Sequence, residues 1–354
     1  MNREAALRGA GLVLLAAAAV AFPQAFPNPA VTLYGVLALI FVTVASAWNI
    51  FSGYTGYISL GHAVFYGSGA YAMGIAAKHW NITGTTVFAL LPLSAAVGAA
   101  IAVPFGLIAL RVRRHTFIVV TIAVFFIFQL MAFNFSFTGG SSGLSSPFLN
   151  WPLAGYNTPF YYIALASAAG TVFISWLIRR SRFGLQLRAI RDDEDRARGL
   201  GVKAMRVKLL AFVLSGAITA MIGAVWFFFI NQVQPQTGFD PLFDLTVVLM
   251  AFLGGYGTIA GPVLGALIIE PGTRWLNAQS QLSGASEIIL GAVFLVVVLF
   301  VPRGIIPTGG EWITKLRTKG RPAVIPAATI GAPAGAEDSA PDSATAAHGS
   351  GGAR

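Results

Sequence analysis

Long apolar stretches alternate with short polar ones along most of this chain. Each apolar stretch is close to the ~20 residues that a helix needs to cross a bilayer. This pattern predicts an all-α polytopic membrane protein. The apolar stretches lie near residues 8–26, 31–51, 57–77, 86–110, 116–135, 160–178, 209–231, 242–269 and 285–301.

The first stretch follows Arg3 and Arg8, which is also the pattern of a signal peptide. No small-residue cleavage site precedes Pro23, and further spans follow. We therefore interpret the stretch as the first span, with cleavage as the alternative.

Basic residues predict the orientation of the spans, because loops rich in Lys and Arg stay in the cytoplasm. Such residues gather at the N-terminus, at the end of the fourth stretch, in the window 179–208 and after the last stretch. Both termini are therefore expected to be cytoplasmic. Loops 78–85, 136–159 and 232–241 hold almost no Lys or Arg and are expected outside.

The stretch 242–269 does not fit a single crossing, which would bring Arg303 to the outside. It contains Gly254, Gly255, Gly257, Gly261 and Pro262. We expect a broken, re-entrant helical segment with both ends outside, where protein or water covers the irregular backbone. The prediction is about eight transmembrane helices plus this re-entrant segment, with a plain ninth crossing as the alternative.

The window 179–208 is strongly charged, with ten of the 23 Lys and Arg residues and the four consecutive acids Asp192 to Asp195. Charges of this kind cost roughly 2.5–3.5 kcal/mol each at the centre of a membrane. Apolar residues recur at mostly helical intervals, and Gly199 and Gly201 follow. The pattern indicates an ordered amphipathic helix in water; the alternative is a plain solvated connection.

Two domains are expected. Residues 1–319 form a transmembrane permease domain that includes a cytoplasmic coupling loop at 179–208. From Gly320 onward Ala, Pro, Gly, Ser and Thr dominate. Such a composition cannot bury a core, so 320–354 is predicted to be a disordered cytoplasmic tail.

Composition narrows the function. The chain has 354 residues, of which 56% are hydrophobic and 10% charged, against ~25% charged in soluble proteins. The net charge of +10 sits at span ends, so it indicates no nucleic-acid partner. The chain has no Cys, no Gly-Lys dipeptide and no acid between Glu4 and Asp192. We therefore expect no bound cofactor, no metal and no catalytic residue, and a conduit that takes its energy from a partner.

Two glycine-interrupted segments, Ser59–Gly74 and Leu253–Ala266, stand in opposite halves of the chain. Interrupted helices in matching halves are typical of a translocation path. The alternative is close helix packing through small residues. The path candidates are Ser59, Gly61, His62, Phe65, Gly69, Tyr71, Gly254, Gly255 and Gly257.

Four blocks resemble the branched-chain amino-acid permease family of ABC importers, and specifically its LivM-type subunit. They lie at 53–72, 138–144 (TGGSSGL), 187–224 and 253–266. Importer permeases carry a cytoplasmic Glu-Ala-Ala motif followed by Gly. Here Asp195-Arg196-Ala197 with Gly201 takes that place. Members often open the fifth span with Gly-Pro-Tyr-Phe, where this chain has residues 114–117, Arg-His-Thr-Phe. That departure bears on which substrate the chain carries, and not on its resemblance to the family.

The resemblance implies an importer of the bacterial cytoplasmic (inner) membrane. Its parts are this chain, a second permease of LivH type, two ABC ATPases that bind ATP and Mg, and an extracytoplasmic binding protein. Members carry branched-chain amino acids, and relatives carry urea, amides or other amino acids. The residues implied in ATPase coupling are Asp192, Asp193, Glu194, Asp195, Arg196, Ala197 and Gly201.

The alternative function is a stand-alone channel or secondary transporter for a small polar solute such as urea or amides. The shortage of acids argues against ion coupling, and a passive channel has no use for an ordered charged helix.

Overall fold

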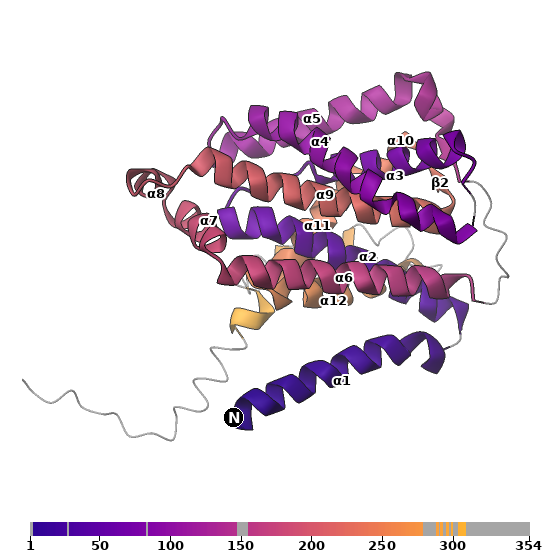
Figure 1. Cartoon of the computed structure of the whole chain (residues 1–354), viewed down its shortest axis with the longest axis horizontal. Helices are drawn as coiled ribbons and strands as arrows, with labels where there is room; N and C mark the ends of the chain where they lie inside the picture. The colour runs from indigo at the N-terminus through magenta and orange to yellow at the C-terminus, as the bar shows by residue number, and fades with distance from the viewer. Residues whose placement is uncertain are drawn as a thin grey trace, which may run out of the picture. The chain divides into compact units, whose positions relative to one another are not determined.

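The computed structural model describes residues 3–26, 28–82, 84–146, 155–278, 288–289, 291–292, 295–296, 299 and 304–308. The predicted tail at 320–354 and most of the predicted span at 285–301 lie outside these residues. Within them the chain is almost entirely helical (Figure 1). The long helices are α1 (Arg3–Ala25), α2 (Pro29–Trp48), α3 (His62–His79), α4 (Leu91–Ala109), α5 (Arg114–Asn134), α6 (Asn157–Arg180), α9 (Ala204–Ile230), α11 (Pro241–Gly254) and α12 (Ala260–Ala278).

Shorter elements join these helices. Strands β1 (Leu144–Ser145) and β2 (Gln232–Val233) pair antiparallel, with Leu144 opposite Val233. The other short elements are η1 (Asn49–Gly53), η2 (Gly84–Leu90), η3 (Ser136–Thr138), η4 (Gly140–Ser142), α7 (Arg182–Asp192), α8 (Glu194–Gly199) and α10 (Pro235–Gly238).

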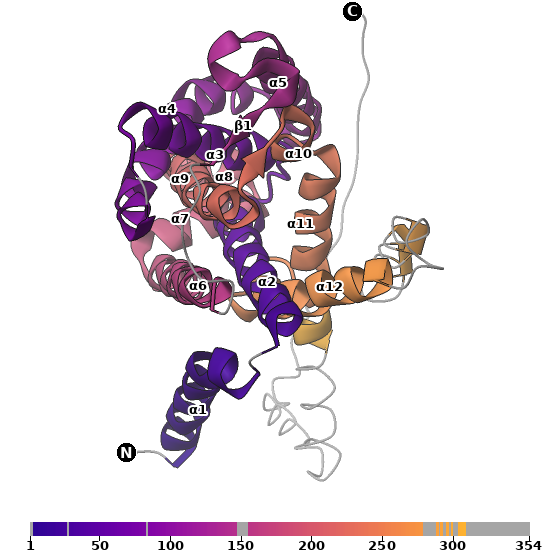
Figure 2. The ribbon, with the colours of Figure 1, turned by 90° about the vertical axis from the view of Figure 1, so that its right-hand side faces the viewer.

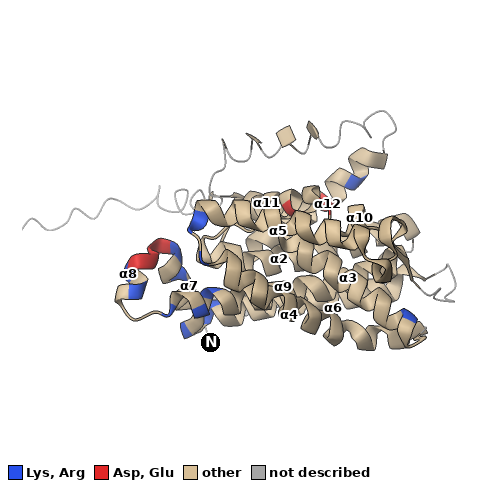
Figure 3. Ribbon diagram, turned by 90° about the horizontal axis from the view of Figure 1, so that it is seen from above, with Lys and Arg blue, Asp and Glu red and all other residues tan. Residues whose placement is uncertain are grey.

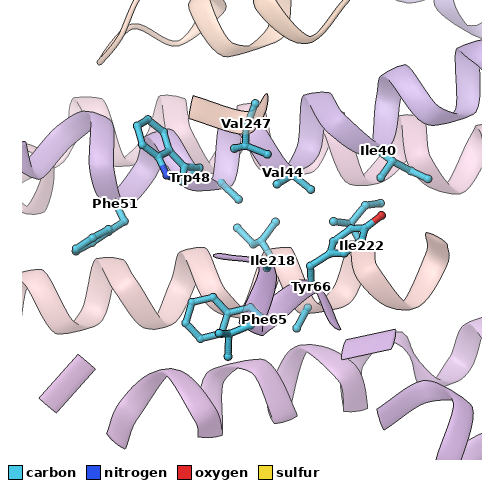
Figure 4. Packing of buried hydrophobic residues seen from close by; sticks show 14 of the residues in the cluster. Ile40, Val44, Trp48, Phe51, Phe65, Tyr66, Ile218, Ile222 and Val247 are labelled. Carbon is cyan, nitrogen blue, oxygen red and sulfur yellow. The ribbon is translucent and has the colours of Figure 1, made fainter. Parts of the chain in front are cut away.

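Helix α9 is the centre of the helical assembly and packs against α2, α3 and α4 (Figures 1 and 2). Figure 4 shows Trp48 and Val44 of α2, Phe65 of α3 and Ile218 of α9 among the side chains between these helices. Burial of such aliphatic and aromatic surface, with small residues where backbones approach, holds helices together in lipid.

In the described part of the chain, six helical segments are long and apolar enough to cross a membrane: 29–53, 84–109, 114–134, 157–180, 204–230 and 235–254. The multi-pass membrane architecture is therefore confirmed. The helix in the region of the predicted span 57–77 is shorter than predicted. Residues 56–61 are not helical, and α3 begins only at His62.

The predicted break in 242–269 is present, at residues 255–259 between α11 and α12. A Cβ on Gly254 would overlap the backbone of Gly261, and one on Gly265 would overlap that of Met250. These pairings make α11 and α12 an antiparallel hairpin whose tip is 255–259. Because α12 continues to Ala278, Glu270 lies inside a helix.

The charged window forms two helices rather than the single helix that we predicted. Asp193 has an extended backbone (φ −156°, ψ 109°), so α7 ends before it. The Asp193 side chain then accepts a hydrogen bond from the backbone N–H of Arg196 at 3.0 Å. An Asp at this position is a strong N-cap, and it starts α8 in a new direction.

Candidate functional site

Charged residues gather at α7 and α8, whereas the ribbon of the long helices carries few charges (Figure 3). We call this the α7–α8 end of the molecule. Its exposed residues include Leu185 on α7 and Leu200 after α8, which are 58% and 85% exposed. Leu187, Ile190 and Ala197 from the same window are buried. The two helices therefore pack one face on the chain and present another, part apolar and part charged.

Arg191, near the end of α7, fastens that helix to two distant elements. One guanidinium nitrogen, Nη1, donates to the carbonyl of Gly53 at the end of η1, at 3.1 Å. The guanidinium carbon lies 4.7 Å from the centre of the Tyr256 ring, in the tip of the α11–α12 hairpin. Tyr256 in turn donates its hydroxyl to the carbonyl of Ser52 at 2.7 Å. A shift of α7 therefore acts directly on the end of α2 and on the hairpin tip.

Asn49 and Arg114 complete this cluster. The Asn49 amide donates to the carbonyl of Thr258 at 2.7 Å and accepts from the N–H of Gly257 at 2.9 Å. Arg114, which opens α5, donates Nη2 to the carbonyls of Ile190 and Arg191 at 2.8 and 2.6 Å. A cation at these last carbonyls of α7 also suits the negative end of the helix dipole.

Glu194 of α8 is held by Lys208 of α9, whose side chain is 1% exposed. Lys208 Nζ lies 2.8 Å from Glu194 Oε1 and donates to the Tyr57 hydroxyl at 3.1 Å. Tyr57 donates its hydroxyl to the other Glu194 oxygen. Burial raises the pKa of the Glu194 carboxyl, but the bonds from Lys208 and Tyr57 outweigh it and the pKa is lowered. Glu194 therefore stays ionised at neutral pH as the counter-ion of a buried ammonium.

The four acids do not form one uniform surface. They face Arg111, Arg113 and Arg114 across a cavity of about 440 Å³ between the α4–α5 connection and α8. Glu194 is directed inward to Lys208, whereas Asp193 caps α8 and pairs at 3.1 Å with the exposed Arg196. Asp192 and Asp195 are exposed. The acids thus divide into interior anchors and outward-facing groups.

Gly201 ends this segment in the left-handed region, at φ +87°. A Cβ at Gly201 would meet nothing within 4 Å, so backbone conformation alone favours glycine at this position.

The path candidates before and in α3 belong to the packed core. His62 lies between Ser59 Oγ, at 3.1 Å from Nδ1, and Ser215 Oγ, at 2.7 Å from Nε2. Because Ser215 donates to the carbonyl of Ala47, its oxygen accepts from His62, which assigns the proton to Nε2. Ser59, His62 and Phe65 are fully buried and line none of the described cavities.

Glycines of α3 allow close approach of neighbouring helices. A Cβ at Gly69 would overlap the carbonyl of Ala220 in α9, and one at Gly61 would lie 3.0 Å from Phe105 and from the carbonyl of Thr121. Tyr71 differs, since it lines an apolar cavity of about 270 Å³ bounded by α3, α4 and α5. Its hydroxyl is buried, with no hydrogen-bond partner among the described residues.

Gly254, Gly255 and Gly257 lie together at the hairpin tip. Gly257 has φ +76°, and a Cβ there would overlap the Arg191 guanidinium. The predicted path residues therefore form three groups: a polar core around His62, a cavity wall at Tyr71, and a glycine tip beside α7.

Sequence reasoning missed the residues that connect these groups. Four of them hold α7 or α8 to the rest of the chain, namely Tyr57, Arg114, Arg191 and Lys208. Asn49 holds the hairpin tip to the end of α2. A signal was available for one of them, because Asn49 is an isolated polar position in an apolar run. Two interior acids were also not among the predicted residues. Asp244 and Glu270 are 2% and 3% exposed.

The described residues contain no group of three or more His, Asp or Glu side chains placed to hold a metal ion. The arrangement provides mechanical links between an exposed charged segment and buried helices.

Comparison with known proteins gives consistent matches. A family model described as "Branched-chain amino acid transport system / permease component" matches residues 31–298. The LivM permease of the high-affinity branched-chain amino acid transport system of Escherichia coli K12 is 25% identical, over 84% of this chain and 74% of its own length. The LivH permease of the same strain is 27% identical, over 75% of this chain and 91% of its own. The ribose import permease RbsC of Bacillus subtilis is 28% identical over 39% of this chain and 46% of its own. No solved structure matches the chain.

Proposed function

Because this chain belongs to the branched-chain amino acid transport system permease family, we propose that it forms part of the translocation path for branched-chain or related amino acids. It is a permease subunit of an ABC importer, crosses the membrane several times and is not itself an enzyme. The membrane in question is the bacterial cytoplasmic (inner) membrane.

The partners follow from this role. A second permease, of the kind represented by the LivH relative, completes the path. Two ATPase subunits bind ATP and Mg, and an extracytoplasmic binding protein delivers the substrate. The positive-inside rule places the α7–α8 end on the cytoplasmic side, where the ATPases are.

One observation carries the coupling role of this end: α7–α8 is exposed on one face and anchored on the other. The anchors are Glu194 with the buried Lys208 and Arg191 with the hairpin tip. An ATPase that contacts the exposed face thereby moves α2, α9 and α11–α12. Asp192, Asp195, Arg196 and Leu200 are the residues best placed for that contact, and Ala197 serves the packing of α8 on its own chain.

The test is transport by the complete complex. This chain is reconstituted in proteoliposomes with the second permease, the ATPases and the binding protein encoded beside it. We expect uptake of L-leucine that requires ATP and the binding protein. Uptake of urea or leucine by this chain alone, without ATPases, would contradict the proposal and favour a channel.

A further inference from the structure

A further cavity, with an apolar wall and several charged residues, lies away from the α7–α8 end. It measures about 390 Å³ and is bounded by α10, α11 and α12 with single residues from α2, α3 and α9. This volume falls in the ~300–1,000 Å³ range of small-molecule sites. We call it the α11–α12 pocket.

The pocket holds an ion pair within an otherwise apolar helix. Arg274 Nε donates to Glu270 Oε1 at 2.8 Å, one helical turn earlier. The Glu270 side chain is 4% exposed and that of Arg274 is 43% exposed. Among the described residues this is the one hydrogen bond of Arg274, which lines the pocket, so its guanidinium keeps donors to spare.

The depth of the pair makes its burial unusual. Glu270 is ten residues beyond the first residue of α12, or about 15 Å along the axis, and Arg274 is about 21 Å along it. The hydrocarbon layer is about 30 Å thick. Ionisable groups at such depth face a water-filled cavity or protein and mark substrate pathways. The hairpin tip lies at the α7–α8 end, so the pocket lies toward the opposite side.

Aromatic faces border the same space. Tyr66 and Trp226 both line the pocket, with ring centres 5.3 Å apart. Such faces attract an ammonium group when it is desolvated. Phe41, Leu242 and Phe243 supply apolar wall.

We propose that the α11–α12 pocket binds the zwitterionic α-amino acid during its passage, with Arg274 receiving the carboxylate and Glu270 the ammonium group. This inference rests on the proposed function and specifies where in this chain the substrate's charged groups are recognised. The apolar wall receives an aliphatic side chain.

The charge balance of the pocket supports a zwitterion. The pocket lining holds one cation, Arg274, and two acids, Glu270 and Asp240. It therefore offers groups of both signs to an amino acid, which brings one charge of each sign at neutral pH. An ion pair between a buried Glu270 and a partly exposed Arg274 contributes little net stability compared with apolar residues of similar size. Packing alone therefore does not explain why α12 carries this pair. Urea carries no charge for either group.

The absence of cysteine in this chain permits a direct test. Asn277, which lines the pocket and is exposed, is replaced by cysteine in Asn277→Cys. The control, Lys78→Cys, is exposed at the end of α3 outside the pocket. The complete importer in membranes is treated with a maleimide, and the labelling rate of this chain is measured with L-leucine, L-leucinamide or 4-methylpentanoate present. Thr246→Cys, also in the pocket wall, is the second reporter if Asn277→Cys is not assembled.

We expect L-leucine to protect Asn277→Cys at concentrations about tenfold or more below those required of either analogue, because each analogue leaves one buried charge unpaired. Lys78→Cys should label at the same rate throughout. Adding Arg274→Gln should abolish the protection by L-leucine.

Two results would overturn the inference: equal protection by the analogues, or no protection by L-leucine in a complex that imports L-leucine. The second result leaves the proposed function intact. Failure of the unmodified complex to import L-leucine, with protection present, would instead remove the transport proposal and leave the binding site.

Discussion

Lys208 is an ammonium that the fold has removed from water, and Glu194 is the group that neutralises it. Removing one partner of a buried pair leaves an uncompensated charge and costs about 3–5 kcal/mol. An exposed pair contributes ~1 kcal/mol or less. Among the ion pairs of α8 in the described residues, Lys208–Glu194 is buried, whereas Arg196–Asp193 is exposed, so these two differ in what they contribute.

Glu194→Gln should lower the thermal midpoint of the purified complex and weaken the attachment of α8, because Lys208 stays buried without its counter-ion. Arg196→Gln is the matched control, since the Arg196 side chain is 87% exposed and its partner Asp193 42%. The measurement is thermal unfolding in detergent together with protease access to residues 193–201. Equal thermal midpoints for the two variants would show that the buried pair does not stabilise the complex more than the exposed pair does.

Gly201 permits a test in which only backbone conformation changes. Gly201→Val should destabilise the turn after α8 by about 1 kcal/mol or more, since β-branched residues rarely adopt a positive φ. Gly201→Asn should be tolerated, since Asn occupies this region more readily. We expect the Val variant, and not the Asn variant, to lose stimulation of ATP hydrolysis by loaded binding protein. Normal stimulation in Gly201→Val would show that coupling does not require the left-handed turn after α8.

At the scale of helices and hairpins, apolar length and glycine position predicted most elements. The stretches at 116–135, 160–178 and 209–231 became α5, α6 and α9, and the glycines near 255 became a hairpin tip. Two features could not be predicted. The break at Asp193 depends on a side chain capping the next helix, and the late start of α3 depends on non-local partners.

The glycines of α3 were ambiguous for a similar reason. Spacing alone cannot distinguish a path from a packing contact, because both need a small residue. The carbonyl of Ala220 beside Gly69 identifies this position as a helix–helix contact.

Gly69→Leu should therefore lower the amount of protein in the membrane, because the larger side chain forces α3 away from α9. Gly170→Leu is the control, because a Cβ at Gly170 of α6 would meet nothing within 4 Å. Membrane level by immunoblot and uptake of L-leucine are measured together. A normal level of Gly69→Leu with uptake lost would favour the path interpretation that the sequence left open.

Across the whole molecule, the α7–α8 end is linked to the interior by few side chains. Arg191 reaches both η1 and the hairpin tip, whereas Arg188 on the same helix bonds only back to Gly184, through Nε at 3.4 Å, in the hydrogen bonds of the described residues. Sequence analysis located the charged window but could not select between these arginines, since both lie in one basic helix.

Arg191→Gln should reduce uptake per ATP hydrolysed while the ATPases remain bound, because α7 no longer holds the hairpin tip. Arg188→Gln should leave that ratio unchanged. The two quantities are measured in the same proteoliposomes, with co-purification of the ATPases as the check on assembly. An unchanged ratio in Arg191→Gln would show that force passes to the membrane helices by another contact.

Asp244 has a consequence for the order in which the protein is made. Its carboxylate accepts the backbone N–H of Ala63 at 3.1 Å, across 181 positions of sequence, at the start of α3. A nascent chain thus releases α3 from the translocon long before the acceptor for its first turn has been synthesised. A chain arrested after residue 239 should leave 54–61 open to protease, and one arrested after 278 should protect it. Equal protection would mean that the helix is complete without its distant acceptor, and that synthesis order places no constraint on this half of the fold.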